Sequence, residues 1–130
     1  MEKLTLRLDA AARALSTLEA ILNESFTVIV RDAAIQRFEY TFESVWKLVK
    51  FYLYEMEGVV CNSPKSCWRE LLTIGLADET EVAQLLAMTD DRNLTSHTYV
   101  ESVAQAIYQK LPDYWRLLQT VHDRLTEKSE

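Results

Sequence analysis

Residues 27–57 read TVIVRDAAIQRFEYTFESVWKLVKFYLYEME, and this stretch decides the fold class. Its apolar side chains recur every three or four residues, which is the repeat of one face of an α-helix. The ridge consists of Ile35, Phe38, Phe42, Val45, Val49 and Leu53. Gly58 follows at once and suits the left-handed conformation that ends many helices. The pattern predicts one long helix from about residue 27 to Glu57.

Two further helices are predicted on either side of this one. Before it, leucines and alanines alternate at spacings of four and three, which predicts a helix over residues 2–23. After it, Ser63 and Pro64 form an N-cap with proline in the first helical position. Gly75 would end that short helix, which we interpret as a connector.

Two sequence pairs have the spacing of a capping box, in which a short polar residue precedes a glutamate by three positions. Asp78 and Glu81 form the first pair, so a long helix should begin there and run to about His97. Thr98 and Glu101 form the second pair and predict the start of the last helix.

The last helix should be kinked at Pro112 and fray over residues 126–130. Four long helices and one short helix indicate an all-α, up-down-up-down four-helix bundle with one extra short helix. No repeat or long linker divides the chain, so residues 1–130 are expected to form a single domain.

Composition and charge exclude several classes of protein. No apolar run approaches the roughly 20 residues of a membrane span, and the N-terminus lacks a signal peptide's features, so a cytoplasmic location is expected. The formal net charge of −6 repels nucleic acid unless a basic patch exists locally. Cys61 and Cys67 are expected to be free thiols, with no metal role because no histidine lies nearby.

Arg92 stands out among the polar residues of the fourth predicted helix. On an ideal helix it shares an otherwise apolar ridge with Leu85 and Met88. A guanidinium facing the core needs carboxylate or phosphate partners. Glu39 and Glu43 lie on one flank of the long helix and are possible internal partners, which would make a buried ion pair.

His97 would lie about 140° around an unbroken helix from Arg92, so both could not face one cleft. If Thr98 caps the last helix, His97 falls in the final turn of the preceding helix, where the backbone can deviate. The alternative for a single histidine is an ordinary side chain at a helix end.

Two blocks of the sequence resemble a known family. They are RDAAIQRFEYTFESVWK at residues 31–47 and DRNLTSHTY at residues 91–99. Together they are similar to the nucleotidyltransferase substrate-binding family within the HEPN superfamily. The resemblance implies a dimeric helical bundle beside a separately encoded minimal nucleotidyltransferase, often as a toxin and antitoxin pair.

The resemblance also implies roles for three residues. Arg92 and His97 match the pair that forms a metal-independent RNA-cleaving site in HEPN ribonucleases, commonly completed across the dimer. Tyr99 matches the tyrosine that the partner enzyme modifies with AMP to silence the toxin. Val100 departs from the family pattern, since relatives often carry an acidic residue there.

Cleavage of RNA without a metal or cofactor needs a base of near-neutral pKa and a fixed cation for the charged phosphorane. His97 and Arg92 fit these two roles, and Asn93 or Ser96 could add hydrogen bonds to phosphate. The basic residues that could attract RNA locally are Lys47, Lys50, Lys65 and Arg69. We interpret them here as solvated faces.

Two other classes of function stay open. The chain could be a non-catalytic subunit that presents a surface or substrate to the nucleotidyltransferase, or a purely structural helical dimer. Glu39 and Glu43 resemble a metal-binding pair, but the Glu-x-x-His motifs of a diiron bundle are absent, so no metal is expected. Three tryptophans and six tyrosines are more aromatic surface than one small core readily hides, which predicts a homodimer.

Overall fold

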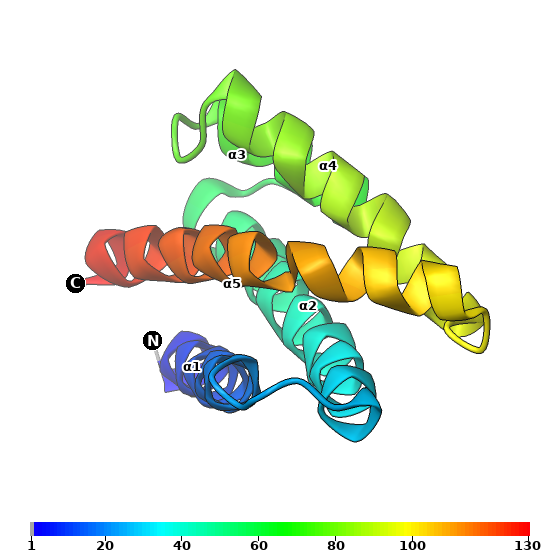
Figure 1. Cartoon of the computed structure of the whole chain (residues 1–130). Helices are drawn as coiled ribbons and strands as arrows, with labels where there is room; N and C mark the ends of the chain where they lie inside the picture. Colours follow the sequence, from blue (N-terminus) through cyan, green and yellow to red (C-terminus); the bar gives the residue numbers. More distant parts are fainter. Residues whose placement is uncertain (1) are drawn as a thin grey trace.

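The computed structural model describes residues 2–130. Within that range it contains helices and the loops between them, and no β-strand (Figure 1). In chain order these are α1 (Glu2–Leu22), α2 (Val28–Glu57), α3 (Pro64–Thr73), α4 (Glu79–Leu94), the 3₁₀ turn η1 (Thr95–His97) and α5 (Glu101–Ser129). Helix makes up 84% of the chain, which confirms the prediction of an all-α bundle with one extra short helix.

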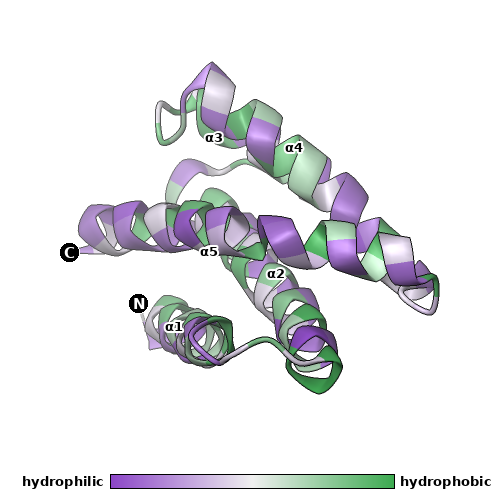
Figure 2. Cartoon of the chain, viewed as in Figure 1, coloured by the Kyte–Doolittle hydropathy of each residue, from purple (hydrophilic) through white to green (hydrophobic). Residues whose placement is uncertain are grey.

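Helix α2 lies at the centre of the bundle. It packs against α1 and α5, while α3 and α4 pair with each other on the opposite side of α5 from α1 (Figure 1). The ridge predicted from the sequence is buried along its whole length and forms much of the core. Phe38 stacks on Tyr114 of α5 at 5.7 Å, and Phe42 meets the edge of Trp68 of α3 at 5.8 Å between ring centroids. Figure 2 shows that hydrophobic and hydrophilic residues alternate along the helices.

Most of the predicted helix ends are confirmed. Gly58 ends α2 with a φ of 65°, and its backbone N–H donates to the Leu53 carbonyl. Ser63 caps α3 with Pro64 in the first turn. The carboxylate of Asp78 accepts from the backbone of Glu81 at 2.8 Å, and Glu81 accepts from the backbone of Asp78 at 3.0 Å. The first capping box is therefore present.

The second predicted capping box was wrong. Val100, which makes no side-chain cap, precedes α5, and the Thr98 hydroxyl instead donates to the Thr95 carbonyl at 3.2 Å. Glu101 pairs with Arg31 of α2, so its carboxylate is not available to the backbone at residue 98. The ion pair with Arg31 on α2 therefore forms instead of the predicted capping box.

The end of the last helix also differs from the prediction. Helix α5 includes Pro112, where a kink was expected, and it remains helical to Ser129 where fraying was expected from residue 126. Leu125 is buried and anchors the final turns to the core. Packing, rather than propensity, therefore sets the end of this helix.

The two cysteines were expected to be free thiols, and this was wrong. Cys61 and Cys67 form a disulfide that joins the loop after α2 to the first turn of α3. The capped turn at Ser63 folds the loop back on itself and brings the two Cα atoms to 5.4 Å, within the range that a disulfide needs. None of the helices within residues 2–130 is both long enough and apolar enough to cross a membrane.

Candidate functional site at the end of α4

Arg92 lies in the last turn of α4 and reaches across to α2. One terminal nitrogen, Nη1, is 3.5 Å from Glu39 Oε2, and the other, Nη2, is 3.6 Å from Glu43 Oε1. Nη1 also donates to the Thr95 hydroxyl at 3.0 Å. The predicted pairing of Arg92 with Glu39 and Glu43 is confirmed. The side chain is half-buried at 26% exposure, so the pair lies at the surface of the core and not within it.

The Arg92 guanidinium forms one wall of an open pocket of about 400 Å³. The other lining residues, all from α2, are Gln36, Glu39, Tyr40 and Glu43. The Nε atom of Arg92 is buried and has no hydrogen-bond partner within residues 2–130. An anion that enters this pocket competes with the two carboxylates for the guanidinium, because its charge is already paired.

His97 ends the 3₁₀ turn and is exposed. Its Nδ1 atom lies 3.5 Å from the Tyr99 hydroxyl, and the two rings meet at a steep angle with centroids 6.0 Å apart. Within residues 2–130 there is no hydrogen bond or ring contact between His97 and Arg92. The structure therefore brings His97 and Tyr99 together and leaves Arg92 with α2.

The remaining predicted residues are also on this exposed turn. Tyr99 is 81% exposed, so its side chain is open to solvent. Asn93 and Ser96 are exposed, and the Ser96 hydroxyl donates to the Asn93 carbonyl at 3.3 Å. Neither side chain forms a hydrogen bond with the side chain of Arg92 or His97 within the described part of the chain. No group of three or more metal-ligating side chains occurs there either.

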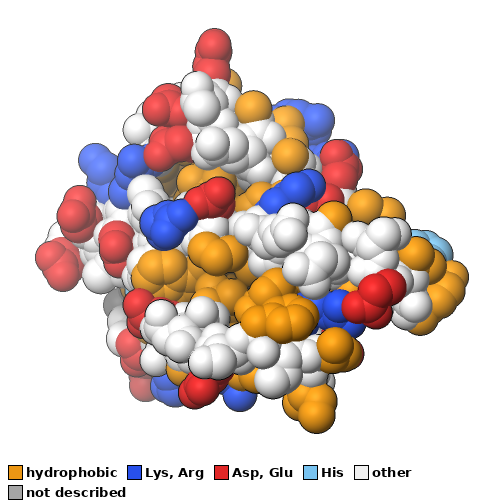
Figure 3. Space-filling view, in the orientation of Figure 1, with side chains coloured by type: hydrophobic (Ala, Val, Ile, Leu, Met, Phe, Trp, Pro, Cys, Tyr) orange, Lys and Arg blue, Asp and Glu red, His pale blue; other side chains and the backbone are white. Residues whose placement is uncertain are grey.

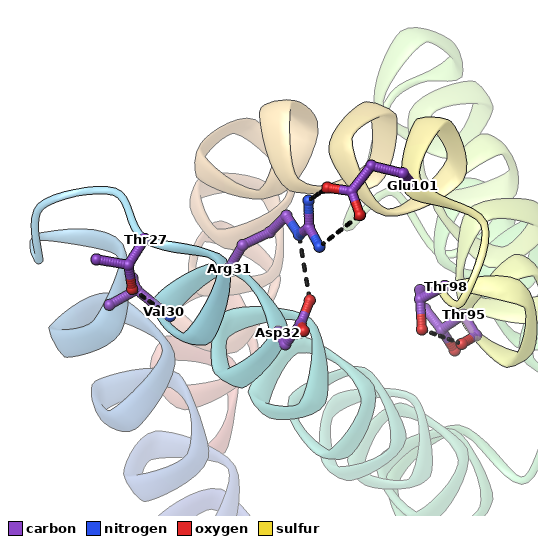
Figure 4. A network of polar contacts seen from close by, with 7 residues as sticks. All are labelled: Thr27, Val30, Arg31, Asp32, Thr95, Thr98 and Glu101. Atoms are coloured by element: carbon purple, nitrogen blue, oxygen red, sulfur yellow. Dashed lines mark hydrogen bonds and ion pairs between the residues drawn. The ribbon is translucent and has the colours of Figure 1, made fainter.

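An ion pair between α2 and α5 fixes the position of this turn (Figure 4). Arg31, only 3% exposed, forms a two-pronged contact with Glu101, in which the longer bond, from Nη2 to Oε2, measures 3.4 Å. Its Nε donates to Asp32 at 3.1 Å. The hydrogen bond from Arg31 lowers the pKa of Glu101 below its ordinary value. Glu101 follows Tyr99 by two residues, so the contact holds the start of α5 against α2.

Sequence reasoning missed Arg31, although the chain carried a signal for it. Arg31 precedes Ile35 and Phe38 by four and seven residues, so it lies on the buried ridge of α2. An arginine at such a position requires a partner, as Arg92 did. The partner lies 70 positions away, which no local pattern reveals.

A second contact anchors the residue that precedes Arg92. Asp91 is buried and accepts hydrogen bonds from the Tyr114 hydroxyl and, at 3.1 Å, from the Lys110 ammonium, both on α5. Burial, together with the bond to Asp91, raises the pKa of the Tyr114 phenol far above its ordinary value. The last turn of α4 is therefore tied to α2 through Arg92 and to α5 through Asp91.

Comparison with known proteins identifies the family. Residues 6–127 match the model of the family described as nucleotidyltransferase substrate binding protein like. The chain belongs to this family. The resemblance drawn from residues 31–47 and 91–99 is thereby confirmed.

The chain is also similar to individual proteins. A Haemophilus influenzae protein named "Probable ribonuclease HepT" is 33% identical over 85 residues, a match that covers 62% of this chain and 57% of the relative. The matched region thus spans little more than half of that relative's length. A crystal structure from Thermus thermophilus superposes with a TM-score of 0.85 at 48% identity, covering 88% of this chain and 98% of that one.

A more distant structure shares the fold. A Haemophilus influenzae protein, described as having the fold of a substrate-binding domain of a nucleotidyltransferase, gives a TM-score of 0.72 at 22% identity. The superposition covers 92% of this chain and 98% of the other. This substrate-binding fold is therefore retained where most of the sequence has changed.

Proposed function

We propose that the protein is a HEPN-type partner of a separately encoded minimal nucleotidyltransferase and that it cleaves RNA without a metal through Arg92 and His97. Family membership and the relative named as a ribonuclease support the proposal. The observation that carries it is the placement of a half-buried guanidinium in an open pocket, close in sequence to an exposed imidazole on the turn that follows.

The chemistry needs only these side chains, the RNA and water. The His97 imidazole takes the proton of a 2′-hydroxyl, the 2′-oxygen bonds to the adjacent phosphorus, and the bond from phosphorus to the 5′-oxygen breaks. The leaving 5′-oxygen takes a proton from water, a 2′,3′-cyclic phosphate remains, and His97 returns its proton to the resulting hydroxide. Arg92 supplies the positive charge for the phosphorane oxygens, a role in which a fixed guanidinium is effective. Asn93 and Ser96 lie near enough in sequence to contribute hydrogen bonds to phosphate.

We further propose that the site is completed by two copies of the chain. Within one chain, Arg92 is held at α2 while His97 lies on the exposed turn, so a second copy is the natural source of the missing partner. Exposed apolar side chains in the neighbouring segment before and at the start of α2 support a homodimer, since such surface is costly in water. They are Phe26, Val28 and Ile29, of which Ile29 is 81% exposed. Figure 3 shows apolar side chains gathered at this end of one face.

RNA cleavage in excess EDTA tests the ribonuclease proposal. Wild type should cleave single-stranded RNA, and Arg92→Ala and His97→Ala should each lower the rate by about 10²–10⁴-fold, as expected for loss of an acid–base group or its supporting cation. Helical circular dichroism should be unchanged in both variants. Ser96→Ala, on the same turn, serves as the matched control with a smaller loss. Wild type without activity, together with an unfolded Arg92→Ala, would show that Arg92 has a structural role only.

Tyr99 is the proposed acceptor of AMP from the partner nucleotidyltransferase. The Tyr99 hydroxyl would attack the α-phosphorus of ATP, losing its proton and releasing pyrophosphate. The exposure of the phenol and its 3.5 Å approach to His97 support this role, because a phosphate added there lies beside the imidazole. Incubation with the neighbouring nucleotidyltransferase, ATP and magnesium should add AMP masses to wild type and none to Tyr99→Phe. If the Tyr99→Phe variant were modified to the same extent as wild type, a residue other than Tyr99 would be the acceptor of AMP.

A non-catalytic binding or scaffold subunit is the alternative function. One observation favours it: Glu39 and Glu43 already pair with both terminal nitrogens of Arg92, as in a purely structural ion pair. On this alternative, the Glu39→Gln and Glu43→Gln double variant would lose stability and gain no affinity for RNA. On the ribonuclease proposal, the same double variant frees the guanidinium and binds RNA more tightly.

A further inference from the structure

A second open pocket of about 310 Å³ lies between α1 and α2, away from the turn that carries His97. Three cations and three aromatic rings line it: Arg7, Lys47, Lys50, Trp46, Phe51 and Tyr54. The proposed function uses none of them. Of the four basic residues first interpreted as solvated faces, Lys47 and Lys50 thus share one pocket, whereas Lys65 pairs with Asp90 at 2.6 Å.

Two of the pocket's cations lie over aromatic rings instead of against carboxylates. The guanidinium carbon of Arg7 is 4.8 Å from the centre of the Phe51 ring, and the Lys50 ammonium is 5.9 Å from the centre of a Trp46 ring. Neither cation forms an ion pair within residues 2–130. Cation–π contact orients a charge without neutralising it. Both charges therefore remain available to an anion, on a chain whose net charge is −6.

The third cation links this pocket to Arg92. Glu43 Oε2 accepts a hydrogen bond from Trp46 Nε1 at 2.9 Å and lies 3.8 Å from the Lys47 ammonium. The other oxygen of the same carboxylate is 3.6 Å from Arg92 Nη2. The pocket therefore begins one helical turn along α2 from the Arg92 site. Phe51 also lines an adjoining pocket together with Glu2 and Glu55, which are the acidic neighbours on that side.

We propose that this pocket binds single-stranded RNA, with an unpaired base stacked on Tyr54 or Trp46 and the flanking phosphates held by Arg7, Lys47 and Lys50. Exposed rings interleaved with cations are the features by which proteins bind single strands, because every base has a stacking face and every nucleotide a phosphate. Tyr54 is 60% exposed, so a base can reach its ring. A duplex presents no free base face and should bind weakly. The inference rests on the proposed function only in naming RNA as the strand.

The test is fluorescence anisotropy with a labelled single-stranded oligoadenylate of about 12 nucleotides. Full-length His97→Ala is used as the background, so the probe is not cleaved and binding is measured separately from catalysis. Tyr54→Ala should weaken binding about tenfold through lost stacking. With three phosphate contacts, log K should fall against log salt with a slope of about −2, and Lys50→Gln should reduce that slope by about 0.7. Lys128→Gln and Leu72→Ala are matched controls, because both residues are exposed and line a pocket on another surface, and they should leave the affinity unchanged.

Each result of these binding experiments either supports or overturns the proposed RNA site. Weaker binding in Tyr54→Ala and a smaller salt slope in Lys50→Gln, with both controls unchanged, would support the site. Absence of binding would overturn it, as would equal binding of an RNA duplex or equal loss in the controls. A wild-type protein that binds through this pocket but never cleaves RNA would refute the ribonuclease proposal and leave this site intact.

Discussion

The two ends of α4 carry the same sequence pattern in their flanking residues and are built differently. At the N-terminal end, Asp78 and Glu81 bond to each other's backbone, and the box forms as the spacing predicts. Beyond the C-terminal end, Thr98 and Glu101 have the same spacing, but no box forms. The glutamate there contacts Arg31, which is 70 positions away along the chain.

The difference shows where local rules stop deciding the structure. Glu81 also has an arginine partner, Arg124 at 2.8 Å, yet it keeps its cap because the same carboxylate oxygen reaches both donors. Glu101 points to α2 and cannot turn back to residue 98. The start of α4 thus has a cap set by its own sequence in addition to a contact with α5, whereas its end lacks such a cap and is held by distant contacts with α2 and α5. The end held by distant contacts is the one that carries the candidate site.

Among the substitutions that test this difference between the two ends of α4, Asp91→Ala should cause the largest loss of stability. It removes the acceptor of the buried Tyr114 hydroxyl and should destabilise the fold by about 1–3 kcal/mol. Asp90→Ala is the matched control, since Asp90 is 64% exposed and its surface pair with Lys65 should be worth about 0–1 kcal/mol. Urea unfolding of both variants provides the measurement. Equal losses would mean that the C-terminal end of α4 is not held by α5.

Removal of the N-cap side chains should cause a smaller loss of stability. Asp78→Ala should cost about 1 kcal/mol, the usual loss for an N-cap acid. Thr98→Ala should change stability by less than about 0.5 kcal/mol, because Thr98 caps no helix. Thermal unfolding of the two variants compares the ends directly. If Thr98→Ala lost as much stability as Asp78→Ala, the result would show that Thr98 does form the second capping box.

The smallest expected effect is the change in stability with pH that comes from the Glu81 carboxylate. Hydrogen bonding to Arg124 holds the pKa of Glu81 below its ordinary value of about 4.3. A lowered folded-state pKa contributes stability that is present above the unfolded value and is lost as pH falls through the folded value. Wild type should therefore exceed Glu81→Gln in stability at pH 7, and this advantage should shrink below about pH 4. A difference that is constant from pH 7 to pH 3 would rule out the ionised contact.

The sequence predicted what depends on neighbours along the chain. Gly58, Ser63 and Asp78 ended or began helices as their residue types require. The pairing of Arg92 with Glu39 and Glu43 is the one distant contact that it predicted, because a guanidinium on an apolar ridge requires acidic partners. It missed the other features that depend on distant contacts.

Two features belong to this second group: the Arg31–Glu101 pair and the helix that continues past residue 126. The Cys61–Cys67 bridge joins residues only six positions apart, and it depends on how the loop turns at Ser63. His97 and Arg92 are separated as an unbroken helix would separate them, although His97 lies on a 3₁₀ turn.

The central claim is that Arg92 and His97 act together although they do not touch within one chain. Mixing Arg92→Ala with His97→Ala tests it most directly, because an exchanged dimer of the two has one intact pair if the site is shared between copies. We expect each variant alone to be inactive in EDTA and the exchanged mixture to cleave single-stranded RNA. A mixture that stays inactive, while wild type cleaves and the variants exchange subunits, would contradict the shared site.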